Sequence, residues 1–425
     1  MTAAAASAST PWRGGWRDGL SYGALGLPLA FVALPLYVVL PAHYASEFGV
    51  PLAALGALLL GARALDAVAD PWIGRLADGW FAHSRGRALV WSAAAAVLLA
   101  IGFRALFFPA VQGTQALLWW CGTVLALSYF CYSVLGIVHQ SWGARLGGSA
   151  AQRARIVSWR EGSALVGVVL ASVLPALAGV AVTGLVFSVV LLLGLVLLAR
   201  APRPLPPPRV MLPVSFAQPL RTPAFRRLLG IYLVNGIAAA VPATLVLFFI
   251  RDRLQAPAWE PLFLAAYFAS GALSMPLWVR AVGRFGLSRS WLAGMVLAVL
   301  GFGWAALLGA GDVWAYAAVC VVSGAALGAD LSLPGALLAG VVQRAGHAGR
   351  LEGAYFGWWN FATKLNLAVA AGISLPLLGA LGYAPGSRGE TALGALTLAY
   401  CVLPCLLKIG AALLLWTRWI PTEEG

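Results

Sequence analysis

The chain has 425 residues, of which 61% are hydrophobic and only 10% are charged. Soluble domains carry roughly 25% charged residues, so this composition excludes a soluble globular protein and indicates a chain embedded in a membrane. The formal net charge is +14, and the placement of the basic residues decides whether it marks a nucleic-acid partner or a membrane topology.

Apolar runs near or above the roughly 20 residues that cross a bilayer recur along the whole chain, separated by short loops rich in Arg, Gly and Pro. The first ten residues are small and polar and lack the pattern of a signal peptide, so we expect them to remain as a tail. We predict twelve membrane-spanning helices, at residues 20–43, 51–76, 88–109, 115–142, 158–180, 183–200, 226–250, 260–281, 291–310, 313–342, 353–381 and 391–417.

The basic residues alternate along the chain. Most arginines fall in the N-terminal segment and in the loops that follow even-numbered spans. The other loops carry only Arg251, Arg253 and Arg388, with Arg104 near the end of the third span. By the positive-inside rule we expect an integral protein of a bacterial cytoplasmic membrane with both termini in the cytoplasm. The charge is a topology signal, so we expect the lipid bilayer and no nucleic acid as a partner.

A Pro-rich, basic connection at residues 201–222 separates six spans from six. We interpret it as a semi-rigid cytoplasmic linker between an N-terminal six-helix bundle, residues 1–200, and a C-terminal one, residues 223–425. Aligning Pro71 with Pro276 places an apolar-to-basic boundary at the same point of each half, as in transporters built from parallel repeats. Only the first half has an aspartate there, which predicts that this half holds a coupling ion.

Asp66 and Asp70 lie one helical turn apart inside the second apolar run, directly before Pro71. Arg63 shares their helical face. An ionised carboxylate at the centre of a membrane helix costs roughly 3 kcal/mol, and such residues usually mark an ion or substrate pathway. We interpret the three residues as part of a cation-coupling site; the alternative is a structural ion pair with Arg63.

Lys364 is one of only two lysines, and it lies about three turns inside the eleventh apolar run, close to Trp359, Asn360 and Asn366. Because a charge at this depth needs a partner, we predict that Lys364 pairs with the aspartates of the second span. The alternative is a side chain that extends to the cytoplasmic surface.

Two distant motifs carry a family resemblance. Residues 63–78 read R-x-x-D-x-x-x-D-P-x-x-G-x-x-x-D, and residues 349–373 read GRLEGAYFGWWNFATKLNLAVAAGI. The motifs resemble the major facilitator superfamily and, within it, the glycoside–pentoside–hexuronide:cation symporter family. The loop signature of the superfamily is matched by Gly74, Asp78, Gly86 and Arg87.

The resemblance implies an all-α major facilitator fold, with twelve transmembrane helices in two six-helix bundles, and secondary active transport by alternating access. It also implies that Asp66 and Asp70 bind the coupling cation and that Lys364 is their basic partner across a central cavity. The chain departs from the family at Pro28 and Ser133, where the family has carboxylates that recognise the sugar.

Neutral oxygen ligands are missing as well, because Phe130 and Ala69 stand where the family has Thr and Asn. Sodium needs several oxygen ligands, whereas a proton needs one carboxylate. We therefore prefer the proton as the coupling ion, with sodium as the alternative, and we expect no other cofactor.

The resemblance implies symport of an organic solute such as a sugar or a glycoside. A lipid or lysolipid is the alternative, since the lysophospholipid symporters of vertebrates share the second-helix aspartates and the eleventh-helix lysine. A non-transporting membrane sensor is an alternative of another class. We expect no enzyme, because the chain has no H-E-x-x-H, no G-x-S-x-G and no Cys/His dyad.

Arg160 could line the substrate cavity or cap the fifth span with Glu161. Asp330, which has no basic neighbour in the sequence, could line it or accept hydrogen bonds in a helix broken by Pro334. A buried histidine such as His139 is more often an interface residue than a relay, and aromatics near span ends are usually belt residues. The candidates for the cavity wall are Ser133, Arg160, Tyr22, Trp359, Asn360, His139 and Asp330.

The loop between the second and third spans is predicted to form a cytoplasmic gate, with Gly74, Asp78, Arg85 and Arg87 as its residues beside Arg75. The five cysteines fall inside apolar runs without the spacing of metal ligands, so we expect neither a metal site nor a catalytic residue. We expect a monomer.

Overall fold

The structure is a computed structural model that describes residues 12–205, 215 and 217–424. Every regular element in this part of the chain is helical. The α-helices of the first half are α1 Trp16–Gly23, α2 Gly26–Leu34, α3 Leu40–Phe48, α4 Leu52–His83, α5 Arg85–Phe107, α6 Thr114–Arg145 and α7 Ala150–Arg200. Those that follow are α8 Gln218–Arg221, α9 Pro223–Phe248, α10 Glu260–Gly303, α11 Val313–Arg344, α12 Glu352–Ala380, α13 Glu390–Thr397, α14 Leu403–Leu414 and α15 Ile420–Glu424.

Short irregular helical turns join or extend several of these helices. Two 3₁₀ turns, Pro257–Trp259 and Trp304–Leu307, flank α10. The π-helical turns are Pro35–Val39, Phe249–Arg253, Leu398–Val402 and Leu415–Trp419. The first span is therefore α1 to α3, with a π turn that begins at Pro35. The last span is α13 to α15, with π turns that begin at Leu398 and Leu415.

The described residues contain nine helical stretches that are long and apolar enough to cross a membrane. Two of them, Ala150–Arg200 and Pro257–Leu307, have 51 residues each and double back on themselves. Counting each as two spans, and adding the 32-residue α4 with its charged side chains, gives twelve. The predicted all-α membrane fold with twelve spans is confirmed.

The two reversals are sharper than the sequence predicted. Short loops were expected at 181–182 and 282–290, but one glycine makes each corner: Gly179 has φ 76° and ψ 169°, and Gly286 has φ 80° and ψ 172°. Residues with a side chain rarely adopt such a backbone, whereas glycine does so at little cost. Helical hydrogen bonding therefore resumes at once on both sides.

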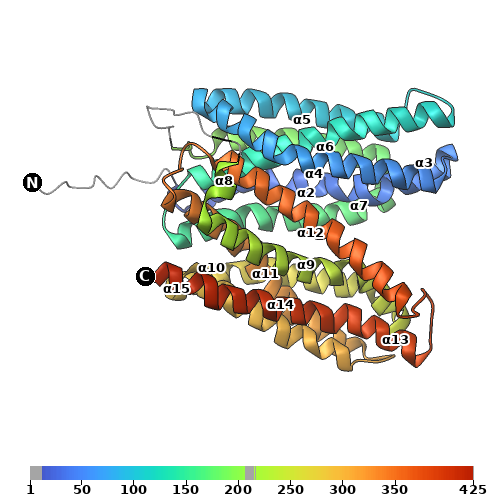
Figure 1. Ribbon diagram of the computed structural model, residues 1–425. Coiled ribbons are helices and arrows are strands. Elements are labelled where there is room, and N and C mark those ends of the chain that lie inside the picture. Colours follow the sequence, from blue (N-terminus) through green and yellow to red (C-terminus); the bar gives the residue numbers. More distant parts are fainter. Residues whose placement is uncertain (1–11, 206–214, 216, 425) are drawn as a thin grey trace, which may run out of the picture.

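The helices form two groups that are separated in Figure 1 as an upper and a lower layer. One buried apolar cluster lies wholly within residues 12–201 and another wholly within 240–401, while a third joins residues of both halves. Helix α12 packs against α4 of the first half and α9 of the second, so it bridges the two. The linker predicted at 201–222 lies largely outside the described residues.

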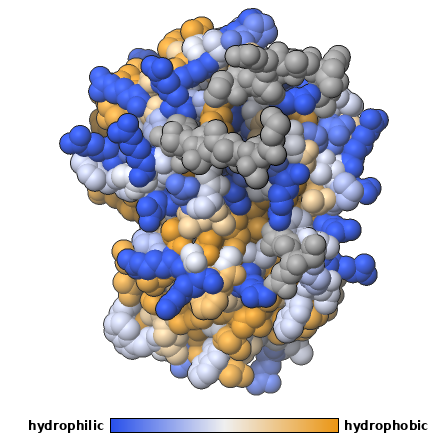
Figure 2. Space-filling view, turned by 90° about the vertical axis from the view of Figure 1, so that its left-hand side faces the viewer, coloured by the Kyte–Doolittle hydropathy of each residue, from blue (hydrophilic) through white to orange (hydrophobic). Residues whose placement is uncertain are grey.

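The two ends of the molecule differ. Helices α8 and α15 lie at the left end of Figure 1, which we call the α8 end, and α3 and α13 lie at the right end. Arginines that close or open helices, such as Arg85, Arg200 and Arg344, lie at the α8 end. Figure 2 views the molecule from there, and hydrophilic residues project all around that face. The alternation of basic loops in the sequence thus corresponds to one basic end of the fold.

Candidate functional site

A buried ion-pair cluster joins the two halves at the middle of α4. The Nζ atom of Lys364, on α12, lies 2.7 Å from Asp66 Oδ2 and 2.7 Å from Asp70 Oδ2. Lys364 also donates to Ser133 Oγ on α6 at 2.9 Å, and Ser133 donates to Asp66 Oδ1 at 2.8 Å. Asp66 is 5% exposed and Asp70 is fully buried. One ammonium group thus holds two carboxylates that are almost completely removed from solvent.

The local sequence brings these side chains together in two ways. Pro71 lies inside α4 and has no N–H to donate, so the helical ladder is interrupted beside Asp70. Gly357 faces that point from α12: a Cβ atom there would lie 2.5 Å from the carbonyl oxygen of Asp70. The absence of a side chain lets the two backbones touch, as small residues do between membrane helices. Lys364 then reaches both aspartates two turns further along α12.

Gly357→Ala is expected to separate α12 from α4. The added methyl group clashes with backbone, which cannot rotate away, so we expect a loss of about 1–3 kcal/mol in the free energy of unfolding. Gly372→Ala in the same helix is the matched control, because a Cβ there meets nothing within 4 Å. Thermal unfolding of both variants in detergent checks the prediction, and equal melting temperatures for the two would contradict it.

Arg63, on the same helix as the aspartates, contacts an aromatic ring. Its guanidinium carbon lies 3.7 Å from the ring centroid of Tyr37, a cation–π contact, and the residue is exposed. No ion pair links it to Asp66 or Asp70 in the described part of the chain. The base that neutralises the aspartates therefore comes from the other half of the molecule.

One candidate for the cavity wall, Arg160, forms a local contact on α7 with its neighbour Glu161. Arg160 Nη2 lies 2.6 Å from Glu161 Oε1, and Arg160 Nε lies 2.9 Å from the same oxygen. Both side chains are mostly buried. The pairing of neighbours is the arrangement that the sequence offered as the alternative to a free, substrate-facing arginine.

Tyr22 and His139 interlock α1 with α6. The Tyr22 hydroxyl donates to the carbonyl oxygen of His139 at 3.1 Å, and His139 Nε2 donates to the carbonyl oxygen of Tyr22 at 2.7 Å. The ring centroids are 4.6 Å apart. Both residues are buried, and Nδ1 of His139 has no hydrogen-bond partner among the described residues. This reciprocal pair holds two helices of the first half together.

On α12, Trp359 and Asn360 lie one turn before Lys364. Trp359 is buried and stacks on Tyr232 of α9, with the ring centroids 3.7 Å apart. Asn360 is half-buried. The aromatic residue is therefore a packing contact within the second half, and Asn360 faces the same region as the lysine.

Asp330 has a basic partner that the sequence analysis did not find. Lys408 Nζ, on α14, lies 2.5 Å from Asp330 Oδ2. Asp330 Oδ1 accepts hydrogen bonds from Asn235 Nδ2 at 3.1 Å and from Trp291 Nε1 at 2.9 Å. The partner is 78 residues away in the chain, so the immediate sequence around Asp330 does not reveal it.

A second buried cluster closes the α8 end. Asp78 Oδ1, on α4, accepts from Arg145 Nη2 and from the backbone N–H of Gly353, both at 2.7 Å. Asp78 Oδ2 accepts from the N–H of Ala354 at 2.8 Å, and Arg145 Nε donates to Glu352 Oε2 at 2.9 Å. Side chains of the three charged residues are 2% exposed. This latch, Asp78–Arg145–Glu352, ties α4, α6 and the start of α12 together.

The predicted gate residues divide between the latch and its surroundings. Gly74 lies against Gly353, where an added Cβ would be 2.1 Å from the carbonyl oxygen of that residue. Arg85 instead donates to the carbonyl oxygen of Ala199 and lies over the Trp142 ring. Arg87 is exposed. The arginine that meets Asp78 is thus Arg145, and neither predicted arginine takes that place in the described structure.

Arg145, Glu352 and Lys408 were not selected from the sequence. The signal was available, since Lys408 is the other of the two lysines and lies inside the twelfth apolar run. Glu352 is one of only 14 acidic residues and stands at the start of a span. The rarity of lysine and of acidic residues in this chain marks Lys408 and Glu352, whereas Arg145 is one of many arginines, and sequence alone does not pair them.

The chain matches one protein family along nearly its whole length. A family model described as MFS/sugar transport protein matches residues 21–421. A search of curated proteins finds no match. Among solved structures, a bacterial homologue of the iron transporter ferroportin, in an outward-facing state, matches with a TM-score of 0.65 at 18% identity, over 93% of this chain and 98% of that one.

Two sugar transporters are similar in fold. A variant of the Escherichia coli fucose:proton symporter matches with a TM-score of 0.65 at 13% identity, over 93% of this chain and 97% of that one. A proton:xylose symporter bound to 6-bromo-6-deoxy-D-glucose matches with a TM-score of 0.63 at 14% identity, over 95% of this chain and 94% of that one. With the family model covering nearly the whole chain, the protein belongs to the MFS/sugar transport protein family, whose members are transporters and not enzymes.

Proposed function

We propose that the protein is a secondary transporter that couples the movement of an organic solute, such as a sugar or a glycoside, to that of a cation. The proton is the preferred cation and sodium the alternative. The observation that carries the proposal is the pair of buried aspartates, Asp66 and Asp70, held by the single ammonium group of Lys364. Its place in the glycoside–pentoside–hexuronide:cation symporter family is part of the same proposal.

The charge of this cluster requires one more cation. Two ionised carboxylates and one ammonium group carry a net charge of −1, in a place where Asp66 and Asp70 are buried. An unbalanced buried charge is costly. Asp70 Oδ1 has no hydrogen-bond partner among the described residues, so it is the atom best placed to receive a proton. One bound proton makes the cluster neutral.

Lys364 and the coupling cation compete for the same oxygen atoms. The ammonium group lies within ion-pair distance of both carboxylates, the position that a metal cation would also need. Sodium would compete with Lys364 for the Oδ2 atoms of both aspartates. A proton on one aspartate only weakens the ion pair and lets Lys364 move. The geometry therefore favours the proton over sodium.

The latch and the Asp66 cluster lie along the same contact between α4 and α12, so a change at the cluster can affect the latch. Asp70 and Asp78 lie two turns apart on α4, and both face α12: Gly357 touches Asp70, and Gly353 binds Asp78. Because Lys364 joins the same two helices, protonation at its aspartates changes the attraction along the α4–α12 contact. We propose that neutralisation of the cluster with cargo bound allows the latch to open and the two halves to rock.

The comparisons support the choice of cargo and ion. The family model is described as a sugar transport family, and two structures with a similar fold are named as proton symporters of fucose and xylose. A lipid remains the alternative cargo, since Pro28 and Ser133 replace carboxylates that would recognise a sugar. Vesicles that contain the purified protein and a pH-sensitive dye test the proposal directly. Addition of pentoses, hexoses and glycosides should produce a proton flux for at least one class, and fluxes only with lysolipids would overturn the sugar assignment.

Sodium is expected to leave the stability of the protein unchanged. If Lys364 occupies the cation position, replacement of choline chloride by sodium chloride at constant ionic strength should not raise the melting temperature. A ligand at 100 times its dissociation constant would stabilise the protein by roughly 2.7 kcal/mol, an effect that thermal unfolding detects readily. Stabilisation by sodium in the native protein that is lost in Asp70→Asn would make sodium the coupling ion.

A further inference from the structure

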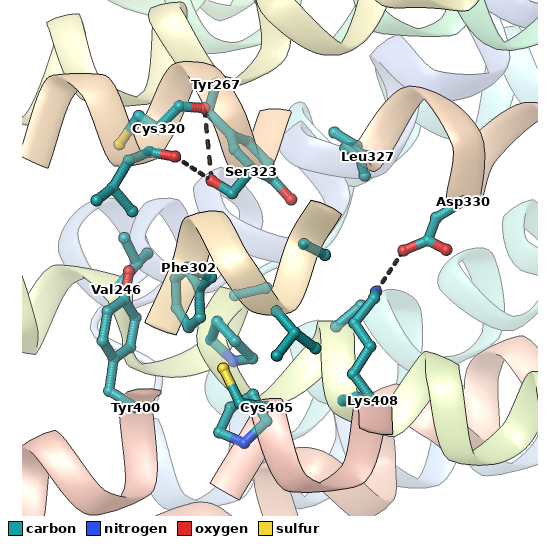
Figure 3. Close-up of a pocket in the computed structure, with 18 of the residues that line it drawn as sticks. Val246, Tyr267, Phe302, Cys320, Ser323, Leu327, Asp330, Tyr400, Cys405 and Lys408 are labelled. Carbon is teal, nitrogen blue, oxygen red and sulfur yellow. Dashed lines mark hydrogen bonds and ion pairs between the residues drawn. The ribbon is translucent and has the colours of Figure 1, made fainter. Parts of the chain in front are cut away.

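A separate cavity lies inside the second half. Its volume is about 200 Å³, and α9, α10, α11 and α14 surround it, as Figure 3 shows. It extends from the end of the bundle near α13 toward the middle, where Asp330 lies. None of the residues that form the Asp66 cluster or the latch lines it. Six aromatic rings form much of the wall: Phe263, Tyr267, Phe268, Phe302, Tyr316 and Tyr400.

The cavity has one charged end. Asp330 and Lys408 are the only charged side chains among the described residues that line it. Some other polar groups of the wall bond to one another: the hydroxyl groups of Tyr316 and Tyr400 are 2.6 Å apart, and Ser323 donates to the carbonyl oxygen of Val319 at 2.6 Å. The result is a largely aromatic and aliphatic chamber with a charged pair at one end.

The polar end offers unused hydrogen-bond donors, whereas each oxygen of Asp330 already accepts at least one hydrogen bond. Both oxygens of Asp330 are occupied, by Asn235, Trp291 and Lys408. An ammonium group has three N–H donors, and Asp330 is the one partner that the described structure gives to Lys408. Two N–H groups of Lys408 therefore remain for a ligand, which must present an acceptor such as a carbonyl oxygen.

The charge and the volume of the cavity limit further which ligands can bind in it. Asp330 and Lys408 together are neutral, so a charged ligand would leave an unbalanced buried charge, whereas an uncharged one would not. A dry apolar cavity of about 150 Å³ holds a benzene molecule. A cavity of about 200 Å³ accommodates a single ring with a short substituent. Aromatic walls suit such a ring through edge-to-face contacts.

We propose that this cavity is a binding site for a small, uncharged aromatic molecule that carries a carbonyl oxygen. The ring lies among the aromatic side chains, and the carbonyl oxygen accepts a hydrogen bond from Lys408. The exposed residues Ala239 and Ala243 of α9 line one side of the cavity and form its mouth. The site does not depend on the transport reaction, and it can be tested without a known cargo.

Fluorine NMR of para-fluoroacetophenone, added to the full-length protein in lipid nanodiscs, tests the proposal. The fluorine signal should broaden more than it does with protein-free nanodiscs. Ala243→Phe fills the mouth and should abolish the additional broadening. Ala265→Phe is the matched control, since Ala265 is also exposed, lies on α10 and does not line the cavity. It should broaden the signal as the native protein does.

The hydrogen bond to Lys408 is tested with para-fluoroethylbenzene, which has a similar shape and no carbonyl oxygen. A net hydrogen bond corresponds to a several-fold to about tenfold gain in affinity, so this probe should bind weaker by that factor. Equal binding of the two probes would overturn the role of Lys408. Equal broadening with Ala243→Phe and Ala265→Phe would overturn the site. If gel filtration shows that Ala243→Phe is misfolded, Ala239→Phe at the same mouth replaces it.

Discussion

Replacement of Asp70 by asparagine is expected to uncouple transport from the proton gradient. The variant leaves Asp66 and Lys364 as a neutral pair, so the cluster no longer needs a cation before the halves can rock. The buried charge that enforces coupling is worth roughly 3 kcal/mol. We therefore expect gradient-driven accumulation in proteoliposomes to fall about a hundredfold, while exchange of cargo at equal concentrations continues.

The control for this experiment is Asp312→Asn. Asp312 is exposed in a loop and only accepts a hydrogen bond from the N–H of Gly309. The same chemical change there should leave accumulation intact. If Asp70→Asn accumulates cargo as well as the native protein does, the aspartate pair is not the coupling site. If it loses exchange as well as accumulation, Asp70 is needed for movement of the empty carrier or for cargo binding and not for coupling alone.

Arg145→Met is expected to have the largest effect on stability. Arg145 is the only base that contacts Asp78 and Glu352 in the described latch. Without it, two buried carboxylates face each other. Removal of one partner from a buried ion pair typically costs about 3–5 kcal/mol, because the remaining charge is left in a place that water does not reach. The melting temperature of the purified protein measures this loss.

Two further variants separate the charge from the volume of Arg145. The triple variant Asp78→Asn, Arg145→Met, Glu352→Gln removes all three charges and should recover much of the stability. Arg155→Met is the control, since Arg155 is exposed and makes only a long contact of 3.4 Å to the carbonyl oxygen of Gly14; we expect a change within about 0.5 kcal/mol. A melting temperature of Arg145→Met equal to that of the native protein would mean that the latch contributes nothing to the folded state.

One residue of the latch could be predicted from the sequence, and its partner could not. Asp78 was predicted at the gate, because its motif is local and falls between two apolar runs. The arginines predicted with it at the gate were Arg85 and Arg87, which are near in the chain. The structure supplies Arg145 from α6, 67 residues away. With arginines near many helix ends, sequence offers no way to choose among them; the packing of α6 beside α4 makes the choice.

The same distinction holds for the lysines. The prediction that Lys364 meets the second-span aspartates came from a family resemblance together with the need of a buried charge for a partner, and the structure places these atoms 2.7 Å apart. No such motif marked Lys408, so the sequence offered Asp330 no basic partner, and the structure supplies one from α14. Whether the Asp66 cluster serves as a cation site stays a proposal that the variants above test.

By itself the sequence determined that this protein spans a membrane twelve times, that basic loops alternate, and that two aspartates share one face of the second span. Those properties depend on composition and on spacings within a single helix. Only the tertiary structure decided that Gly179 and Gly286 replace loops, that Arg145 closes the latch, and that Lys408 neutralises Asp330. Backbone angles at a corner and contacts between distant helices are set by packing, which residues adjacent in sequence do not encode.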